Sequence, residues 1–159
     1  MNNIIVRKVA ADDIKAVFEL TRELSKYESL PFGNNEQLLG EALEKGYLEA
    51  IICYLDDLPC GLATYFFNYS TFGGYRGLFI EDLFVNPDIR GFGIGKTLMT
   101  ELARIALDMN CKKISWVCLD WNKLGIGFYE TMGAKKTPEW IQFTLSEDKM
   151  KELISGAQR

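Results

Sequence analysis

The sequence contains no histidine, and this absence removes several kinds of functional site. Histidine is the commonest general base and metal ligand, so a Ser-His-Asp triad is excluded and a metal centre is disfavoured. The four cysteines do not form the C-x-x-C spacing of zinc or redox sites. We therefore expect no bound metal, and proton transfer has to use Glu, Asp, Tyr, Lys, Cys or water.

The chain also lacks an excess of positive charge and any long apolar stretch. It has 18 Lys and Arg against 22 Asp and Glu, a net charge of −4, which argues against a nucleic-acid partner. No apolar run is long enough to span a membrane, and the start of the sequence lacks the apolar core of a signal peptide. We expect a cytoplasmic protein with reduced thiols and no membrane partner.

The length and the apolar pattern predict one α/β domain over residues 1–159. Alternating and helical periodicities predict the order β-α-α-β-β-β-α-β-α-β, and therefore a mixed sheet flanked by helices. Strands are expected at residues 4–9, 47–55, 60–69, 78–85, 113–119 and 136–145. Helices are expected after a cap at Asp12 or Asp13, near residues 38–43 and 95–109, after Asn122, and after Ser146.

A glycine-rich stretch at residues 90–96, Arg-Gly-Phe-Gly-Ile-Gly-Lys, lies between an apolar run and a helical pattern. A strand, a glycine turn and a helix start together present backbone N–H groups to a phosphate. A P-loop requires glycine where Arg90 stands, and the alternating glycines do not match the G-x-G-x-x-G dinucleotide motif. The remaining interpretations are an R-x-x-G-x-G phosphate loop and, less favoured, a glycine-rich loop without a ligand.

Six segments together resemble the GNAT family of N-acetyltransferases, and in particular its spermidine/spermine and thialysine branch. They are the R-x-x-G-x-G loop and residues 24–28 (L-S-K-Y-E), 80–85 (I-E-D-L-F-V), 120–122 (D-W-N), 128–134 (F-Y-E-T-M-G-A) and 139–140 (E-W). The resemblance implies the GNAT fold, a mostly antiparallel sheet, acetyl-CoA as co-substrate and a homodimer.

The resemblance also implies how acetyl-CoA is held. Loop N–H groups would cradle the pyrophosphate, with the charges of Arg90 and Lys96 nearby, and the preceding strand would pair with the pantetheine amides. Asn122 would contact the CoA arm, although it is equally expected as a helix cap. The implied cofactor-binding residues are Leu83, Phe84, Val85, Arg90, Gly91, Phe92, Gly93, Ile94, Gly95, Lys96, Asn122, Gly125 and Tyr129.

The transfer of an acetyl group to an amine needs a base, because an amine with a pKa of ~10 is protonated at neutral pH. Glu81 and Asp82 are adjacent and would point to opposite faces of a regular strand, so one of them should reach the acceptor. The resemblance implies that Glu81 is the base and that Tyr129 protonates the departing thiolate. The alternatives are solvated or paired acids and a tyrosine that serves only in packing.

A small cationic amine would be recognised by carboxylates and aromatic faces. The resemblance implies a substrate site formed by Tyr27, Glu28, Glu81, Asp82, Trp116, Glu139 and Trp140. Trp116 and Trp140 are equally expected to fill the core.

From these features we expect an enzyme that transfers acetyl from acetyl-CoA directly to a polyamine or diamine in a ternary complex. Two alternatives stay open. One is an acetyltransferase for thialysine or a lysine-like amino acid, and the other is a non-catalytic acyl-CoA-binding module on the same fold.

Overall fold

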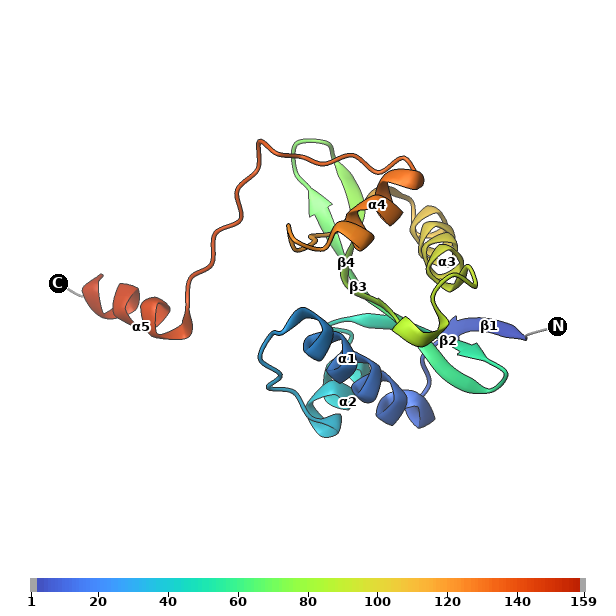
Figure 1. The fold of residues 1–159 in the computed structure, drawn as a ribbon. Coiled ribbons are helices and arrows are strands. Elements are labelled where there is room, and N and C mark those ends of the chain that lie inside the picture. Colours follow the sequence, from blue (N-terminus) through green and yellow to red (C-terminus); the bar gives the residue numbers. More distant parts are fainter. Residues whose placement is uncertain (1–2, 158–159) are drawn as a thin grey trace. The chain divides into compact units, whose positions relative to one another are not determined.

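The computed structural model describes residues 3–157 of the chain (Figure 1). The chain divides into two compact units, one ending at Val117 and the other beginning at Cys118. The first unit contains the sheet and the helices α1 (Ile14–Glu28), α2 (Glu36–Glu44) and α3 (Ile94–Asp108), and the second contains α4 (Lys123–Thr131) and α5 (Glu147–Gly156).

The first unit is built on a five-stranded sheet with the strand order β1-β2-β3-β4-β5. Neighbouring strands are antiparallel except β4 and β5, which run parallel because a helical crossover joins them. This topology confirms the predicted α/β class and the mixed, mostly antiparallel sheet. The strands are β1 (Ile4–Lys8), β2 (Glu49–Leu55), β3 (Leu58–Ser70), β4 (Tyr75–Val85) and β5 (Cys111–Ser115).

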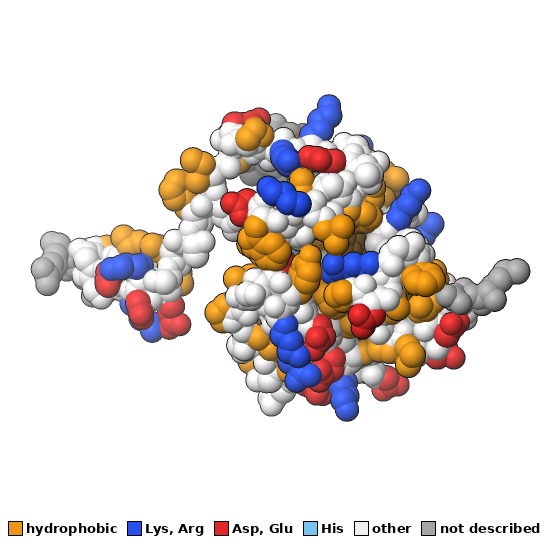
Figure 2. Space-filling model, in the orientation of Figure 1, with side chains coloured by type: hydrophobic (Ala, Val, Ile, Leu, Met, Phe, Trp, Pro, Cys, Tyr) orange, Lys and Arg blue, Asp and Glu red, His pale blue; other side chains and the backbone are white. Residues whose placement is uncertain are grey.

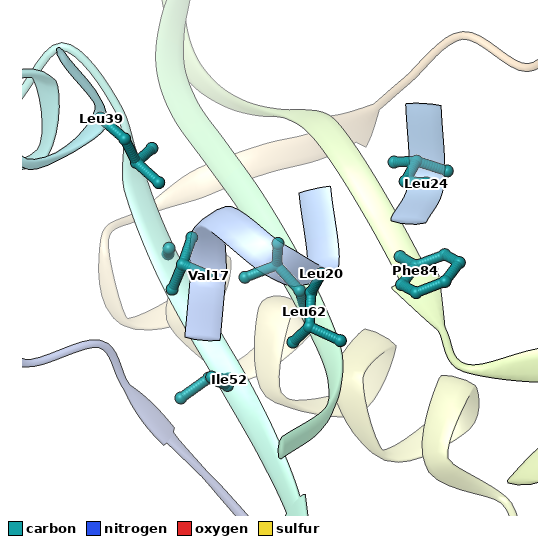
Figure 3. Packing of buried hydrophobic residues seen from close by; sticks show 8 residues of the cluster. Val17, Leu20, Leu24, Leu39, Ile52, Leu62 and Phe84 are labelled. Atoms are coloured by element: carbon teal, nitrogen blue, oxygen red, sulfur yellow. The ribbon is translucent and has the colours of Figure 1, made fainter. Parts of the chain in front are cut away.

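Helices cover both faces of this sheet. On one face, α1 (Ile14–Glu28) and α2 (Glu36–Glu44) pack on a cluster of buried apolar side chains (Figure 3). On the other face lies α3 (Ile94–Asp108). This helix packs closely on β3, since a Cβ placed on Gly61 would lie 3.2 Å from Ile94 and 3.1 Å from Leu98. The cluster under α1 consists of Val17, Leu20, Leu24, Leu39, Ala50, Ile52, Leu62 and Phe84.

Asp13 does not cap α1 as expected, since its side chain makes no cap hydrogen bond to that helix. Its buried carboxylate instead accepts hydrogen bonds from Arg7 at 2.6 and 2.8 Å, from the Tyr54 hydroxyl at 2.6 Å and from the Ala10 N–H at 2.7 Å. Arg7 is the largest of the causes that hold the pKa of Asp13 well below its usual range. The carboxylate therefore ties the start of α1 to β1 and β2.

The second unit confirms two predicted helix caps and corrects one predicted strand. The Asn122 side chain accepts the Gly125 N–H at 3.0 Å before α4 (Lys123–Thr131), and the Ser146 hydroxyl accepts the Lys149 N–H at 3.4 Å before α5 (Glu147–Gly156). The strand predicted at residues 136–145 is wrong, because this stretch contains no strand. A strand requires a neighbour that pairs with its backbone, and no ladder in the described part of the chain includes this segment.

Candidate active site

The carboxyl-terminal half of β4 has a partner on one edge only. Its residues pair with β3 as far as Val85, whereas the pairing with β5 ends where Phe79 meets Ser115. The fifth strand was predicted at residues 113–119, but it lies at residues 111–115 and stops four residues earlier. Within the described residues, the β4 edge at Leu83, Phe84 and Val85 therefore has no strand beside it and can pair with an extended ligand.

A β-bulge interrupts β4 at Glu81. Tyr65 lies opposite Ile80 and Thr64 lies opposite Asp82, so Glu81 is the extra residue and has no partner on β3. Bulges of this kind re-aim side chains and occur often beside active sites. The prediction that Glu81 and Asp82 point to opposite faces assumed a regular strand, and the structure contains a bulge at this position instead. Glu81 is exposed, whereas Asp82 is half-buried.

Asp82 lies on the face of the sheet that α1 covers. It is two residues from Phe84, and Thr64 is two residues from Leu62; both apolar residues belong to the cluster under α1. The Thr64 hydroxyl donates to Asp82 Oδ2 at 2.6 Å, and the Asp82 N–H donates to the same hydroxyl at 3.1 Å. The residue patterns did not indicate Thr64, because a threonine in an apolar strand is ordinary.

The structure brings two other predicted substrate acids, Glu28 and Glu81, close to Asp82. Burial, followed by the charge of Asp82, raises the pKa of Glu28 at the end of α1 and of Glu81 in the bulge. Burial also raises the pKa of Asp82, against the lowering effect of its hydrogen bond from Thr64. The three carboxyls thus form a partly desolvated acidic cluster that a cation would stabilise.

The glycine-rich loop has the conformation that only glycine adopts readily. Gly91 and Gly93 have φ of 94° and 81°, and a Cβ on either would meet nothing within 4 Å. Gly93 is the N-cap of α3, and the Thr97 N–H donates back to its carbonyl at 3.0 Å. The N–H groups of Ile94, Gly95 and Lys96 precede that bond, so they have no acceptor within the helix. The loop has the geometry of an anion cradle at a helix start, and its contact with the pyrophosphate stays a prediction.

Arg90 connects this loop to the acidic cluster. Its guanidinium carbon lies 4.7 Å from the centre of the Tyr27 ring, and its Nε donates to the Val85 carbonyl at 3.2 Å. Tyr27 directly precedes Glu28 in α1. The sequence predicted a charge beside the phosphates at Arg90, whereas in the structure this side chain binds the end of β4 and stacks on an aromatic ring of the predicted amine site.

The unpaired edge, the anion cradle and the acidic cluster meet at the end of one strand, which is an arrangement for a phosphate-bearing donor and a cationic acceptor. The sequence matches the acetyltransferase (GNAT) family over residues 14–134. The chain belongs to the GNAT family. This membership confirms the predicted fold and shows that the protein is an acetyl-CoA-dependent N-acetyltransferase.

Individual relatives match this chain over nearly its whole length. A thialysine N-epsilon-acetyltransferase from Sus scrofa is 30% identical, with 96% of this chain and 98% of that protein covered. The spermidine/spermine N(1)-acetyltransferase-like protein 1 of Homo sapiens is 24% identical over 96% of this chain and 24% of that protein. An integron cassette protein from the mobile metagenome of V. cholerae has a TM-score of 0.80 and 25% identity, covering 95% of this chain and 97% of that one.

The residues of this GNAT chain fit acetyl-CoA on structural grounds. A pyrophosphate needs several convergent N–H donors and room for close approach, and the start of α3 with its two glycines offers both. Phe92 is exposed and Ile94 is buried, so Ile94 anchors the loop in the core while Phe92 stays at the surface. Lys96 is exposed in the first turn of α3, where it adds positive charge.

The other site residues predicted from the GNAT resemblance lie after β5 or in the second unit. Trp116 directly follows β5 and is half-buried, and Trp140 and Glu139 are exposed. Tyr129 lies half-buried in α4, with its ring centre 5.4 Å from that of Phe128.

Gly125 allows Asn122 to approach closely, because a Cβ at Gly125 would lie 2.8 Å from the Asn122 side-chain nitrogen. The cap interpretation of Asn122 is thus confirmed, and its contact with CoA stays a prediction.

No helix among residues 3–157 is long and apolar enough to cross a membrane. In the same part of the chain, no group of three or more Cys, Asp or Glu side chains is arranged to hold a metal ion.

Proposed function

We propose that the enzyme transfers the acetyl group to a primary amine of a small cationic acceptor, directly and within a ternary complex. The observation that carries this proposal is the acidic cluster of Glu28, Glu81 and Asp82 beside the unpaired edge of β4. A bound cation would stabilise the ionised forms of these three carboxyls, because its charge offsets the burial and the mutual repulsion that raise their pKa values. Direct transfer is favoured because burial raises the pKa of the Cys53 and Cys60 thiols, which keeps them protonated and poorly nucleophilic.

The reaction needs three proton transfers. One carboxyl of the Glu81–Asp82 pair takes the first proton of the acceptor ammonium, and the amine nitrogen then attacks the acetyl carbonyl of acetyl-CoA. The new N–C bond forms, the C–S bond breaks, and the sulfur takes a proton from the Tyr129 hydroxyl. The nitrogen gives up its second proton as the amide forms, and this proton restores the Tyr129 hydroxyl. Tyr129 keeps this role as a proposal that rests on the family resemblance of residues 128–134.

Two classes of acceptor remain candidates, each with its own support. Polyamines and diamines carry two or more ammonium groups, which suits a cluster of three acids. Thialysine and similar amino acids carry a side-chain amine, and they are favoured by the thialysine acetyltransferase that matches this chain along almost its full length. The acid cluster accommodates the cationic amine of either class.

The deciding experiment is an assay of CoA release with spermidine, spermine, putrescine, thialysine, lysine and a basic peptide. We expect turnover with at least one of the small amines and none with the peptide. Preference for thialysine and lysine would assign the amino-acid class, and preference for spermidine and putrescine the polyamine class. Calorimetric binding of acetyl-CoA without turnover of any amine would show a binding module instead.

We also propose that the enzyme is a homodimer in which the second unit supplies contacts. Support comes from the large apolar side chains that this unit leaves exposed: Trp140 (78%), Ile141 (76%), Phe143 (89%), Leu153 (63%) and Ile154 (65%). Figure 2 shows hydrophobic side chains at the surface of the segment that leads to α5 and of α5 itself. Light scattering of the full chain should give twice the monomer mass of 18.1 kDa, and a monomer at micromolar concentration would contradict the proposal.

Two further features of the enzyme are part of this proposal. Residues 1–159 act as one catalytic domain, which is supported by a family match that crosses the boundary between the two units. A reducing, cytoplasmic location is supported by the free thiols of Cys53, Cys60, Cys111 and Cys118.

A further inference from the structure

Thr64 is a fully buried polar side chain with a single structural task. It is 1% exposed, and its hydroxyl both donates to the Asp82 carboxylate and accepts the Asp82 N–H. The contact crosses from β3 to β4 at the bulge, directly beside Glu81. A buried hydroxyl in an apolar core costs free energy unless it is paired, so this pair holds the Asp82 side chain in one orientation.

The hydrogen bond occupies only one of the two carboxylate oxygens of Asp82. Oδ2 accepts from Thr64, and within the described residues no hydrogen bond reaches Oδ1. Asp82 is also the more buried of the two adjacent acids, whereas Glu81 is exposed in the bulge. A half-buried carboxylate with one fixed and one available oxygen has the geometry of a general base, while an exposed carboxylate is suited to attracting a cation.

We propose that Asp82 Oδ1 accepts the proton of the acceptor ammonium and that Thr64 is the positioning residue that aims this carboxylate. Glu81 then attracts the cation and takes no proton. This assignment rests on the proposed acetyl transfer to an amine. In the step, the nitrogen loses one proton to Oδ1, its lone pair forms the bond to the acetyl carbon, and the C–S electrons leave with the CoA sulfur. The sulfur takes a proton from the Tyr129 hydroxyl, and the second proton of the nitrogen restores that hydroxyl as the amide forms.

The surroundings of Asp82 determine the pH dependence that this assignment predicts. The charge of Asp82 raises the pKa of Glu28 from α1 and of Glu81 from β4, so these are the titratable groups beside it, and Thr64 faces it from β3. Burial raises the pKa of Asp82, and the Thr64 hydrogen bond lowers it. Removal of that hydroxyl should raise the pKa further, so Asp82 would become protonated and inactive at a higher pH than in the wild-type enzyme.

The first test compares Thr64→Val with Thr64→Ser. Valine keeps the shape and removes the hydroxyl, so the acidic limb of the kcat/KM profile should move up by about one pH unit, as expected for a lost hydrogen bond to a charged group. At a pH on that acidic limb, kcat/KM should fall by roughly tenfold, and serine should restore most of it. Thermal melts show whether each variant is folded. An unchanged limb in a folded Thr64→Val enzyme would refute the positioning role.

The second test separates the two adjacent acids. Asp82→Asn should lower kcat by about 10²-fold or more, the usual contribution of a general base. Glu81→Gln should raise the amine KM with less than a tenfold effect on kcat. The reverse pattern would overturn the assignment in favour of Glu81. Calorimetry should give the wild-type Kd for acetyl-CoA in every variant, and a wild-type enzyme that acetylates no amine would instead defeat the proposed function and this assignment with it.

Discussion

Replacing Gly93 with alanine should weaken acetyl-CoA binding much more than it destabilises the fold, and it therefore tests the phosphate cradle. Gly93 has φ of 81°, and a Cβ there would meet nothing within 4 Å. The Gly93→Ala substitution therefore introduces no steric clash. It destabilises the folded protein only because a residue with a Cβ must adopt the left-handed backbone conformation, which costs about 1–2 kcal/mol. For a chain of this size that corresponds to a fall in Tm of roughly 2–8 °C.

The effect on acetyl-CoA should be much larger than the effect on stability. The new methyl group would occupy the open space at the start of α3, where the pyrophosphate is expected to accept N–H bonds. The loss of one hydrogen bond to a charged group is worth about 1.5–3 kcal/mol. The Kd for acetyl-CoA should therefore increase by about 10- to 150-fold.

Gly46 provides a matched control, because it has φ of 68° and equally open surroundings but closes α2, away from the loop. Gly46→Ala should lower the Tm by a similar amount and leave the Kd unchanged. The measurements are calorimetric titration with acetyl-CoA and thermal melts with and without it. If Gly93→Ala binds acetyl-CoA as tightly as Gly46→Ala does, the cradle is not the phosphate site.

Three further variants test other parts of the structure. Asp13→Asn should lower the free energy of unfolding by about 1–3 kcal/mol in a denaturant titration, because the buried side chain loses the charge that strengthens its hydrogen bonds from Arg7 and Tyr54. Since the folded-state pKa of Asp13 is depressed, the wild-type stabilisation is present at neutral pH and is lost as the pH falls below about 4. Arg90→Gln should raise the amine KM more than the acetyl-CoA Kd if Arg90 positions Tyr27, and the opposite result would make it a phosphate ligand. Tyr129→Phe should lower kcat at least tenfold with an unchanged Kd, and full activity would remove its proposed role as the acid.

Features that depend only on residues close together in the sequence were predictable from the sequence. The loop at residues 90–96, the caps Asn122 and Ser146, and the order of strands and helices follow from turn chemistry, side-chain capping and periodicity. The strand predicted at residues 136–145 failed for the opposite reason. Its alternating apolar residues describe a side-chain pattern, but a strand also needs a neighbour to pair with, and that neighbour is not specified locally.

The active site shows the same division. The alternating glycines between a strand and a helix were enough to indicate a phosphate-binding loop, because backbone freedom belongs to the residues themselves, whereas the amine acceptor was implied by the family resemblance. Only the tertiary structure decided which acid is aimed and how. The bulge at Glu81, the Thr64–Asp82 bond across 18 residues and the Arg90–Tyr27 stack all join segments far apart in the chain. Strand register and helix packing determine such contacts, and one-dimensional spacing does not record them.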